Sequence, residues 1–249
     1  MSEALVLADS LARALNSQDI FERNQLTPDD WQADLLRCES SRYLVCCSRQ
    51  SGKSLTACAL ATHRAAIEPD QTIILISPSE RQARENIRRC QKLLKGAGYG
   101  SEAAVENVTS LLFKNGSRIL GLSSGGHLRG FTVDALIIDE AAYVADDVIG
   151  EAMPFLATRP NAPAICLSTP NGARGWFYKQ FSDASNSWRK IQIPASMVAR
   201  IPTSFLEEQR RELGEAMYRQ EYECSFLEAD TALFDLRMLA GKFEPLGCI

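Results

Sequence analysis

An α/β fold is predicted for this chain of 249 residues, with a mostly parallel sheet covered by helices on both faces. Four runs, at 43–46, 72–76, 136–139 and 164–167, are apolar almost throughout, and helical segments separate them. Strands have this pattern when helices cover both sides of a parallel sheet. A glycine-containing loop follows the first run and two acids end the third, which puts polar groups where parallel strands end.

Composition and charge are those of an ordinary soluble globular protein. Hydrophobic residues make up 45% of the chain and charged residues 23%, with a formal net charge of −4. Because the chain is acidic overall, any contact with DNA must come from a local basic patch. The N-terminus has no signal-peptide pattern and no apolar run is long enough to span a bilayer, so no membrane contact is expected.

The eight cysteines form neither a metal-binding nor a disulfide pattern. They are scattered without a C-x-x-C pair, and the two histidines, His63 and His127, are far apart in the sequence. Several cysteines lie in apolar runs, so we expect buried, reduced thiols in a cytosolic protein rather than a zinc site.

Helical and extended segments alternate along the chain. Residues 1–26 are expected to form a short amphipathic helix and a connector, an N-terminal helical arm. A helix should then start with Thr27 as its N-cap and Pro28 at its first position. The further expected elements are a helix from the Ser77-Pro78-Ser79-Glu80 capping box to about Lys95, a hairpin over 111–120 with an Asn115-Gly116 turn, a helix over 146–157, a strand over 188–193 and a helix over 203–224 broken at Gly214.

A shift in composition near residues 194–196 sets the predicted domain boundary. Residues 27–195 should form the core that contains the sheet, and residues 196–249 a small helical subdomain. A chain of this length can bury one large α/β core and carry a small appendage.

The segment Cys47–Ser54 has the features of a phosphate-binding loop. It lies between an apolar strand and a helix, so its backbone N–H groups and the helix dipole should converge on one anion. Lys53 would reach the β- and γ-phosphates of a nucleotide, and the Ser54 hydroxyl would bind Mg²⁺. Cys47 stands where the G-x-x-x-x-G-K-[ST] pattern has its first glycine. The loop residues expected to bind the nucleotide are Ser48, Arg49, Gln50, Ser51, Gly52, Lys53 and Ser54.

Two carboxylates, Asp139 and Glu140, end the third apolar run. A solvated acidic turn would have the same residues, but here the pair follows a phosphate-binding loop. The carboxyl ends of neighbouring parallel strands share one edge of the sheet, where open α/β sheets bind ligands. Asp139 is therefore expected to hold Mg²⁺ through its water shell, and Glu140 to orient and polarise the attacking water.

Three polar residues near the expected site each allow two interpretations. Ser168 and Thr169 precede Pro170-Asn171-Gly172 and could sense the γ-phosphate or Glu140, but Pro and Asn-Gly also make ordinary turns. Gln32 could pair with N6 and N7 of adenine, or it could be a solvated helix residue. Spacing in the sequence leaves these alternatives open.

Two arginines are candidate arginine fingers, side chains that neutralise charge in the transition state of phosphoryl transfer. Arg129 lies in the glycine-rich loop 125–130, just before the acidic run, and Arg49 lies inside the phosphate-binding loop. Either one could also be a solvated loop residue.

A basic stripe is expected on the helix that starts near Ser79. Such a stripe can follow a DNA backbone, but a solvated helix face has the same pattern and is slightly favoured here. The residues of the stripe are Arg81, Arg84, Arg88, Lys92 and Lys95.

Together these motifs resemble the ATPase domain of the large terminase subunit of tailed bacteriophages, over about residues 25–227. The loop 47–54 is similar to the family's phosphate loop, which lacks the first glycine and has an Arg after the Ser. The pair Asp139–Glu140 resembles its acidic pair, and 168–178 its coupling motif and the residues that follow. Residues 218–222 look like its lid region.

The resemblance implies an additional-strand P-loop NTPase core with a helical lid. It implies ATP and Mg²⁺ as cofactors, and ATP hydrolysis that drives double-stranded DNA into a procapsid in the host cytoplasm. The implied partners are double-stranded DNA, further copies in a homo-oligomeric ring, the portal and the small terminase subunit. In some members an Arg in the loop before the acidic strand acts on the neighbouring subunit's ATP, which implies this role for Arg129.

One feature of the family is missing, and two other functions are considered. Members usually continue into a nuclease domain of ribonuclease-H type. No second acidic strand motif follows Glu140 here, so nuclease activity is not expected. Residues 196–249 are therefore assigned to a helical lid and a linker towards an absent nuclease domain. A helicase-type translocase would also suit Gln32 and the acidic pair, but it needs a second RecA-like domain. A nucleotide-gated scaffold without turnover would have no need of Glu140.

Overall fold

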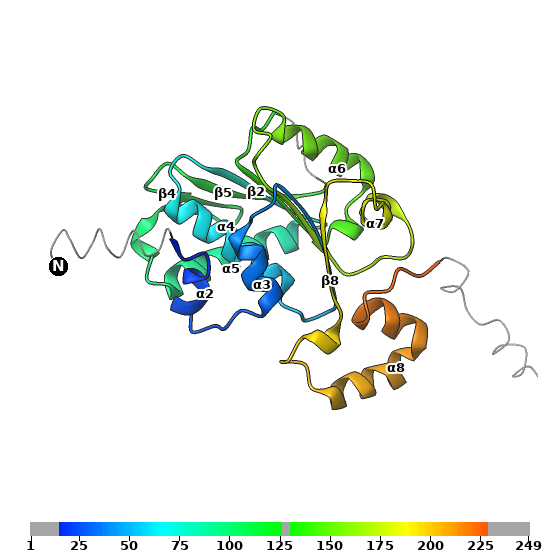
Figure 1. The fold of residues 1–249 in the computed structure, drawn as a ribbon. Helices are drawn as coiled ribbons and strands as arrows, with labels where there is room; N and C mark the ends of the chain where they lie inside the picture. Colours follow the sequence, from blue (N-terminus) through cyan, green and yellow to red (C-terminus); the bar gives the residue numbers. More distant parts are fainter. Residues whose placement is uncertain (1–14, 126–129, 229–249) are drawn as a thin grey trace, which may run out of the picture.

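One sheet with strand order β3-β4-β5-β2-β6-β7-β1-β8 dominates the computed structural model, which describes residues 15–125 and 130–228 (Figure 1). Every pairing is parallel except the two that β4 makes, with β3 and with β5. The fold is therefore α/β with a mostly parallel sheet, as predicted. The strands are β1 (Arg42–Cys47), β2 (Thr72–Ser77), β3 (Ala103–Glu106), β4 (Ser110–Phe113), β5 (Arg118–Ser123), β6 (Ala135–Asp139), β7 (Ala164–Ser168) and β8 (Arg189–Ile193).

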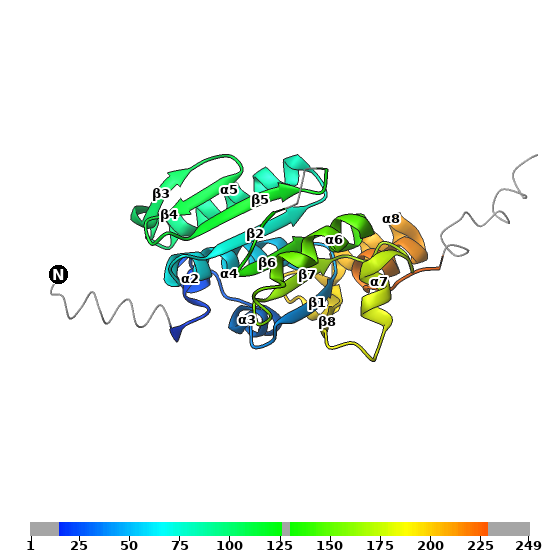
Figure 2. The same cartoon turned by 90° about the horizontal axis from the view of Figure 1, so that it is seen from above.

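Helices cover both faces of the sheet (Figures 1 and 2). The helices α2, α3, α4 and α5 pack on one face, and α6, α7 and two short 3₁₀ segments on the other. The helix α8 lies apart from both layers, beyond the end of β8 (Figure 1). The helices are α2 (Asp19–Arg23), α3 (Asp30–Arg37), α4 (Lys53–Ile67), α5 (Glu80–Gly96), α6 (Asp146–Ala152), α7 (Gly175–Ser182) and α8 (Thr203–Tyr222), with 3₁₀ segments η1 (Gly100–Glu102), η2 (Ala141–Tyr143), η3 (Met153–Leu156) and η4 (Ala195–Met197).

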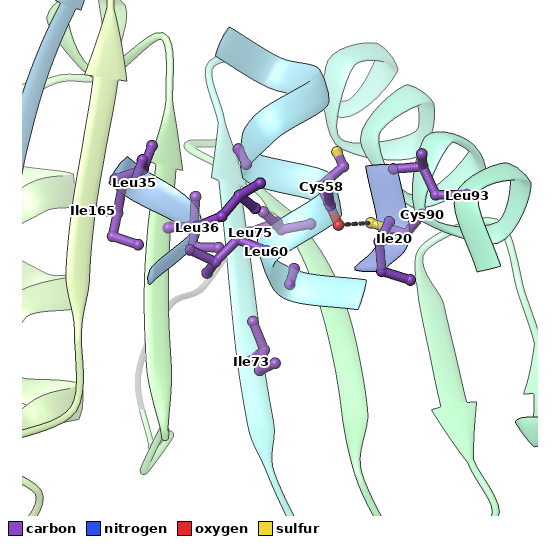
Figure 3. Close-up of a cluster of buried hydrophobic side chains, with 14 of the residues drawn as sticks. Ile20, Leu35, Leu36, Cys58, Leu60, Ile73, Leu75, Cys90, Leu93 and Ile165 are labelled. Atoms are coloured by element: carbon purple, nitrogen blue, oxygen red, sulfur yellow. Dashed lines mark hydrogen bonds between the residues drawn. The ribbon is translucent and has the colours of Figure 1, made fainter. Parts of the chain in front are cut away.

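The central strands are buried on both faces, which explains why their sequences are apolar throughout. On β2, Ile73 and Leu75 belong to the cluster under α2–α5, whereas Ile74 and Ile76 belong to the cluster under α6 and α7. Figure 3 shows part of the first cluster, where α4 and the sheet pack against one another. Each such side chain contributes about 1.5–3 kcal/mol when fully buried, so the two layers hold the sheet rigidly beneath the site.

Strand β7 lies between β1 and β6 and positions the site. Its register pairs Ser168 with Cys46 of β1 and Leu167 with Asp139 of β6. An extra strand between the strand of the phosphate loop and the strand of the acidic pair defines the additional-strand type of P-loop fold. The ends of β1, β7 and β6 consequently meet at one edge of the sheet.

Two helices start later than the sequence analysis predicted. Asp29, not Thr27, is the N-cap of α3, because the Gln32 side chain accepts a hydrogen bond from the Asp29 backbone N–H at 2.8 Å and closes a capping box. Ser79, not Ser77, caps α5, because Ser77 still belongs to β2 and the Ser79 side chain accepts from the Gln82 backbone N–H. Pro28 and Pro78 therefore lie outside the helices.

Several other elements agree with the predictions, and two were missed. The Asn115-Gly116 hairpin is present between β4 and β5, with Gly116 at a φ of +86°, and Gly214 interrupts α8 at a φ of +73°. The strand β3 was missed because most of its residues are exposed and carry no apolar alternation. The helix α7 was not predicted because it begins at Gly175, whose φ of +75° is not helical, so its sequence carries no usual helix-start signal.

The predicted division into arm, core and helical subdomain stays an interpretation. Of the predicted arm 1–26, residues 1–14 lie outside the described residues, while Ile20 and Phe21 of α2 are fully buried in the cluster under α2–α5. The C-terminal helix α8 has a small cluster of its own that includes Leu206 and Tyr218, with Ala195 from η4. The core therefore starts within α2, and α8 packs locally.

Replacing Gly121 should disturb the packing of α5 on β5. A Cβ at Gly121 would lie 2.7 Å from Ile87 Cγ1 and 3.0 Å from the Ala83 carbonyl oxygen, both on α5. We expect Gly121→Ala to lower the free energy of unfolding by about 1–3 kcal/mol, measured by urea denaturation. Gly150→Ala in α6 is the control, because a Cβ there would have no described atom within 4 Å apart from its chain neighbours and its own helix backbone. Equal losses in the two variants would contradict this packing.

Candidate active site

A cavity of about 540 Å³ opens at the edge of the sheet where β1, β6 and β7 end. It brings together residues of the loop after β1, of the acidic pair after β6 and of the turn after β7. It is lined by Arg49, Gln50, Lys53, Pro78, Gln82, Glu140, Tyr143 and Thr169. The fold brings together five residues that the sequence motifs predict at one site, namely Arg49, Gln50, Lys53, Glu140 and Thr169.

Two residues that line this cavity, Lys53 and Glu140, form an ion pair. Lys53 is the first residue of α4 and only 8% exposed, and its Nζ lies 3.1 Å from Glu140 Oε1. Burial acts to lower the pKa of Lys53, but attraction to Glu140 and Asp139 outweighs it and raises that pKa. The ammonium group is therefore charged at neutral pH, as a phosphate ligand must be.

Beside this pair, Ser54 and Asp139 form an oxygen-rich corner. The Ser54 hydroxyl donates to Asp139 Oδ1 at 3.1 Å, and Asp139 is largely buried. A hydroxyl and a carboxylate are hard oxygen ligands of the kind Mg²⁺ takes when phosphate and water complete its shell. The donor set therefore fits the metal that the sequence analysis expected here.

Glu140 has an unusual backbone for its residue type. Its φ of 54° and ψ of 45° are left-handed, which costs about 1–3 kcal/mol for a non-glycine residue and is typical of functional sites. The Ser168 hydroxyl is 3.5 Å from Glu140 Oε2 and accepts from the Ala142 backbone N–H at 3.1 Å. The Ser168 hydroxyl thus lies next to the Glu140 carboxylate, and its role as a sensor stays a prediction.

Tyr143 is a lining residue that the sequence analysis missed. The short segment η2 turns it back over the cavity, where its hydroxyl lies 3.4 Å from the Thr169 hydroxyl and donates to the Pro170 carbonyl oxygen at 3.3 Å. An aromatic residue three positions after Glu140 carries no motif, so the sequence offered no sign of it. The contact connects Thr169 to the short segment that follows the acidic pair.

The phosphate-binding loop is shaped by close packing against α3. Gly52 has a φ of +92°, and a Cβ there would lie 2.8 Å from Gln32 Nε2, so no side chain fits. The Ser51 hydroxyl donates to the Ser48 carbonyl oxygen at 2.9 Å. The Ser48 hydroxyl is buried without a hydrogen-bond partner in the described residues, which is the condition of a group whose partner is a ligand or water.

Gln32 is placed next to the loop, but its amide is already engaged. The side chain is 1% exposed, accepts from the Asp29 backbone N–H and donates to the Thr56 hydroxyl at 2.8 Å. A contact with adenine stays a prediction. In this state Gln32 supports Gly52 instead.

Two arginines connect the phosphate-binding loop to the C-terminal part of the chain. Arg49 pairs with the buried carboxylate of Glu221 on α8 at 2.5 Å, and its backbone N–H donates to the Glu221 carbonyl oxygen at 2.9 Å. Arg200 donates to the Ser51 carbonyl oxygen at 2.8 Å and pairs with Asp29 at 2.6 Å. Arg200 was missed, because it belongs to no motif. The segment that was predicted to be a lid therefore holds the loop directly.

The remaining candidates have mixed outcomes. Arg129 and His127 lie outside the described residues, so the choice between Arg129 and Arg49 as arginine finger stays open. The basic stripe is exposed on α5 as predicted, but Arg84 pairs with Glu80, Arg88 with Glu85 and Lys95 with Glu106. This pairing matches a solvated face, and contact with DNA stays a prediction.

The cysteines of the described residues are free thiols, and all but Cys38 are buried. Burial raises the pKa of Cys47, beside the phosphate-binding loop, to about 12, so this thiol is uncharged at neutral pH. In the part of the chain that the structure describes, no helix has the length and hydropathy needed to cross a bilayer.

The fold and the site are those of an additional-strand P-loop NTPase. A model of the family described as "Terminase large subunit, T4likevirus-type, N-terminal" matches residues 44–240, and the chain belongs to this family. This confirms the resemblance found in the sequence.

Known relatives agree with this assignment. The terminase large subunit of Escherichia phage T5 is 28% identical over 231 residues, covering 87% of this chain and 52% of the relative. That of Thermus virus P23-45 is 25% identical over 262 residues, covering 90% and 54%. The chain thus spans about half the length of the curated relatives it matches. The solved ATPase domain of the large terminase of Thermus phage P74-26 superposes with a TM-score of 0.71 at 25% identity, covering 83% of this chain and 97% of that one.

Removing Glu221 should loosen α8 from the phosphate-binding loop. Glu221→Ala removes the ion pair with Arg49, whose side chain is 61% exposed, so the contribution is at most about 1 kcal/mol. We expect backbone amides near the end of α8 to exchange hydrogen about two- to fivefold faster, measured by mass spectrometry. Glu215→Ala, on the exposed face of the same helix, is the control. No difference between the variants would show that Glu221 does not hold α8.

Proposed function

We propose that this chain is the ATPase domain of a DNA-packaging motor and hydrolyses ATP with Mg²⁺. The observation that carries the proposal is the arrangement of four residues: Lys53 and Glu140 line the cavity, and their chain neighbours Ser54 and Asp139 are paired with each other. Lys53 contacts Glu140 at 3.1 Å and Ser54 contacts Asp139 at 3.1 Å. A cation, a metal-binding pair and a carboxylate are the groups that phosphoryl transfer requires.

Each group has a separate task in this mechanism. The N–H groups of the loop 48–54 and the Lys53 ammonium would hold the β- and γ-phosphates, which releases Glu140 from its ion pair. Glu140, freed from Lys53, would then orient a water for attack on the γ-phosphate. Ser54 and Asp139 would hold Mg²⁺, which neutralises the charge that develops on the phosphate oxygens.

A solved relative supports nucleotide binding by this fold. The large terminase of a thermophilic bacteriophage, at 14% identity and TM-scores of 0.64 and 0.63, is known in complexes with ATP-gamma-S and with ADP. That similarity concerns the fold alone, and the site residues carry the argument for this chain. In this chain, the contacts of Lys53 with Glu140 and of Ser54 with Asp139 support the proposal that Lys53 binds phosphate and that Ser54 and Asp139 bind the metal.

Translocation of double-stranded viral DNA into a procapsid is the function we assign to the hydrolysis. It follows from membership of the terminase family, and it implies a homo-oligomeric ring, the portal and the small subunit as partners in the host cytoplasm. In such a ring, Arg129 would complete a neighbouring site, with Arg49 as the alternative finger. A helicase-type translocase would be stimulated more by single-stranded DNA, and a nucleotide-gated scaffold would not turn over ATP, so ATPase assays with each DNA form separate the three functions.

Lys53→Ala tests the phosphate-binding assignment. The variant should lose ATP turnover by at least about a hundredfold, because Lys53 neutralises phosphate charge in the transition state. Turnover is followed by phosphate release, and folding by circular dichroism. Lys114→Ala, at an exposed position of the β4–β5 turn, should keep the parent rate. A parent rate in Lys53→Ala would refute the assignment.

Glu140→Gln separates binding from chemistry. The amide keeps the shape of the side chain but cannot accept the proton of the attacking water, so hydrolysis should fall by about 10²–10⁴-fold. Because the ion pair to Lys53 is also weakened, the dissociation constant of a fluorescent ATP analogue should stay within about threefold of the parent value or fall. Glu208→Gln, exposed on α8, is the control. Loss of binding with unchanged turnover per bound ATP would contradict the role of Glu140.

A further inference from the structure

The buried side chain of Asn86 reaches the metal end of the site from helix α5. Asn86 is 3% exposed, and its Nδ2 donates to Asp139 Oδ2 at 3.0 Å and to the Ser77 hydroxyl at 3.1 Å. The other carboxylate oxygen of Asp139 accepts from Ser54. Each oxygen of Asp139 is therefore held by a different helix, Oδ1 by Ser54 of α4 and Oδ2 by Asn86 of α5.

The orientation of the Asn86 amide is fixed by its other neighbour. Its Oδ1 accepts from the Arg89 guanidinium at 2.8 Å, and the Cys58 thiol makes a weaker contact at 3.7 Å. Arginine can only donate and an ionised carboxylate can only accept, so only one placement of the amide satisfies both. The two N–H groups and the carbonyl oxygen of Asn86 all form hydrogen bonds, so its amide can take only one orientation.

We propose that Asn86 is a positioning residue for Mg²⁺, which holds Asp139 so that the oxygen shared with Ser54 faces the metal. This inference rests on the proposed function of the site. Groups that hydrogen-bond a metal-binding carboxylate fix its direction, and their loss typically costs 10–100-fold in metal affinity or activity. The same bonds connect Arg89, next to the basic stripe of α5, to Asp139.

The test compares nucleotide affinity with and without the metal. The dissociation constant of a fluorescent ATP analogue is measured with excess Mg²⁺ and with EDTA, and the ratio of the two values reports the metal's contribution. In Asn86→Ala we expect the affinity with Mg²⁺ to fall by about tenfold or more, and the affinity with EDTA to stay within about twofold of the parent. A residue that only supports the fold would lower both affinities alike, and that result would overturn the proposal.

Two further variants keep the test decisive. Arg89→Ala removes only the bond that orients the amide, so we expect a smaller loss of about threefold, again with Mg²⁺ alone. Arg88→Ala, exposed on the next position of α5 and paired with Glu85, should behave as the parent does. If Asn86→Ala does not fold, Arg89→Ala decides, and an unchanged ratio in it refutes the role of Asn86.

Nucleotide binding by the parent protein tests the proposed function, whereas the comparison with the variants tests the role of Asn86. If the parent binds no nucleotide, or binds it equally well with Mg²⁺ and with EDTA, the proposed function itself fails and the role of Asn86 fails with it. If the parent shows the metal's contribution and Asn86→Ala shows the same, only the role of Asn86 is overturned.

Discussion

The ion pair between Lys53 and Glu140 is the interaction on which the site depends. It joins the first residue of α4 to the residue that follows β6, across the edge where β7 also ends. Lys53 is largely buried, and an unpaired buried ammonium costs several kcal/mol, so this charge needs a partner. In the proposed mechanism a phosphate would replace Glu140 as that partner, and Glu140 would then be free to orient the attacking water.

The sheet keeps this edge in place. Strands β1, β7 and β6 are buried on both faces, and their register fixes Ser168 opposite Cys46 and Leu167 opposite Asp139. Because helices cover both faces of the sheet, a shift in the register of one strand would move its apolar side chains out of both hydrophobic clusters. Rigid strands carry the acidic pair, whereas the phosphate-binding loop is held by contacts with α3 and with Glu221 and Arg200 of the C-terminal segment. The loop is therefore the part of the site that the C-terminal segment contacts directly.

The sequence allowed much of this to be predicted. Apolar runs located the central strands, and the carboxyl ends of those runs located Lys53, Ser54, Asp139 and Glu140, because parallel strands end together. The contacts of Tyr143, Arg200, Glu221 and Asn86 could not be predicted. Each depends on where a side chain lies after distant segments have packed together, and only Glu221 belongs to a run, 218–222, that the sequence singled out. The helix starts at Thr27 and Ser77 were wrong because capping residues compete over one or two positions, and Gln32 decided one of them through its side chain.

The decisive experiment is a crystal structure of the chain with Mg²⁺ and a non-hydrolysable ATP analogue. We expect Lys53 to leave Glu140 and to contact the β- and γ-phosphates, while Ser54 and Asp139 flank the metal and Glu140 faces the γ-phosphate. A nucleotide bound elsewhere, with the 3.1 Å contact between Lys53 and Glu140 still in place, would contradict it.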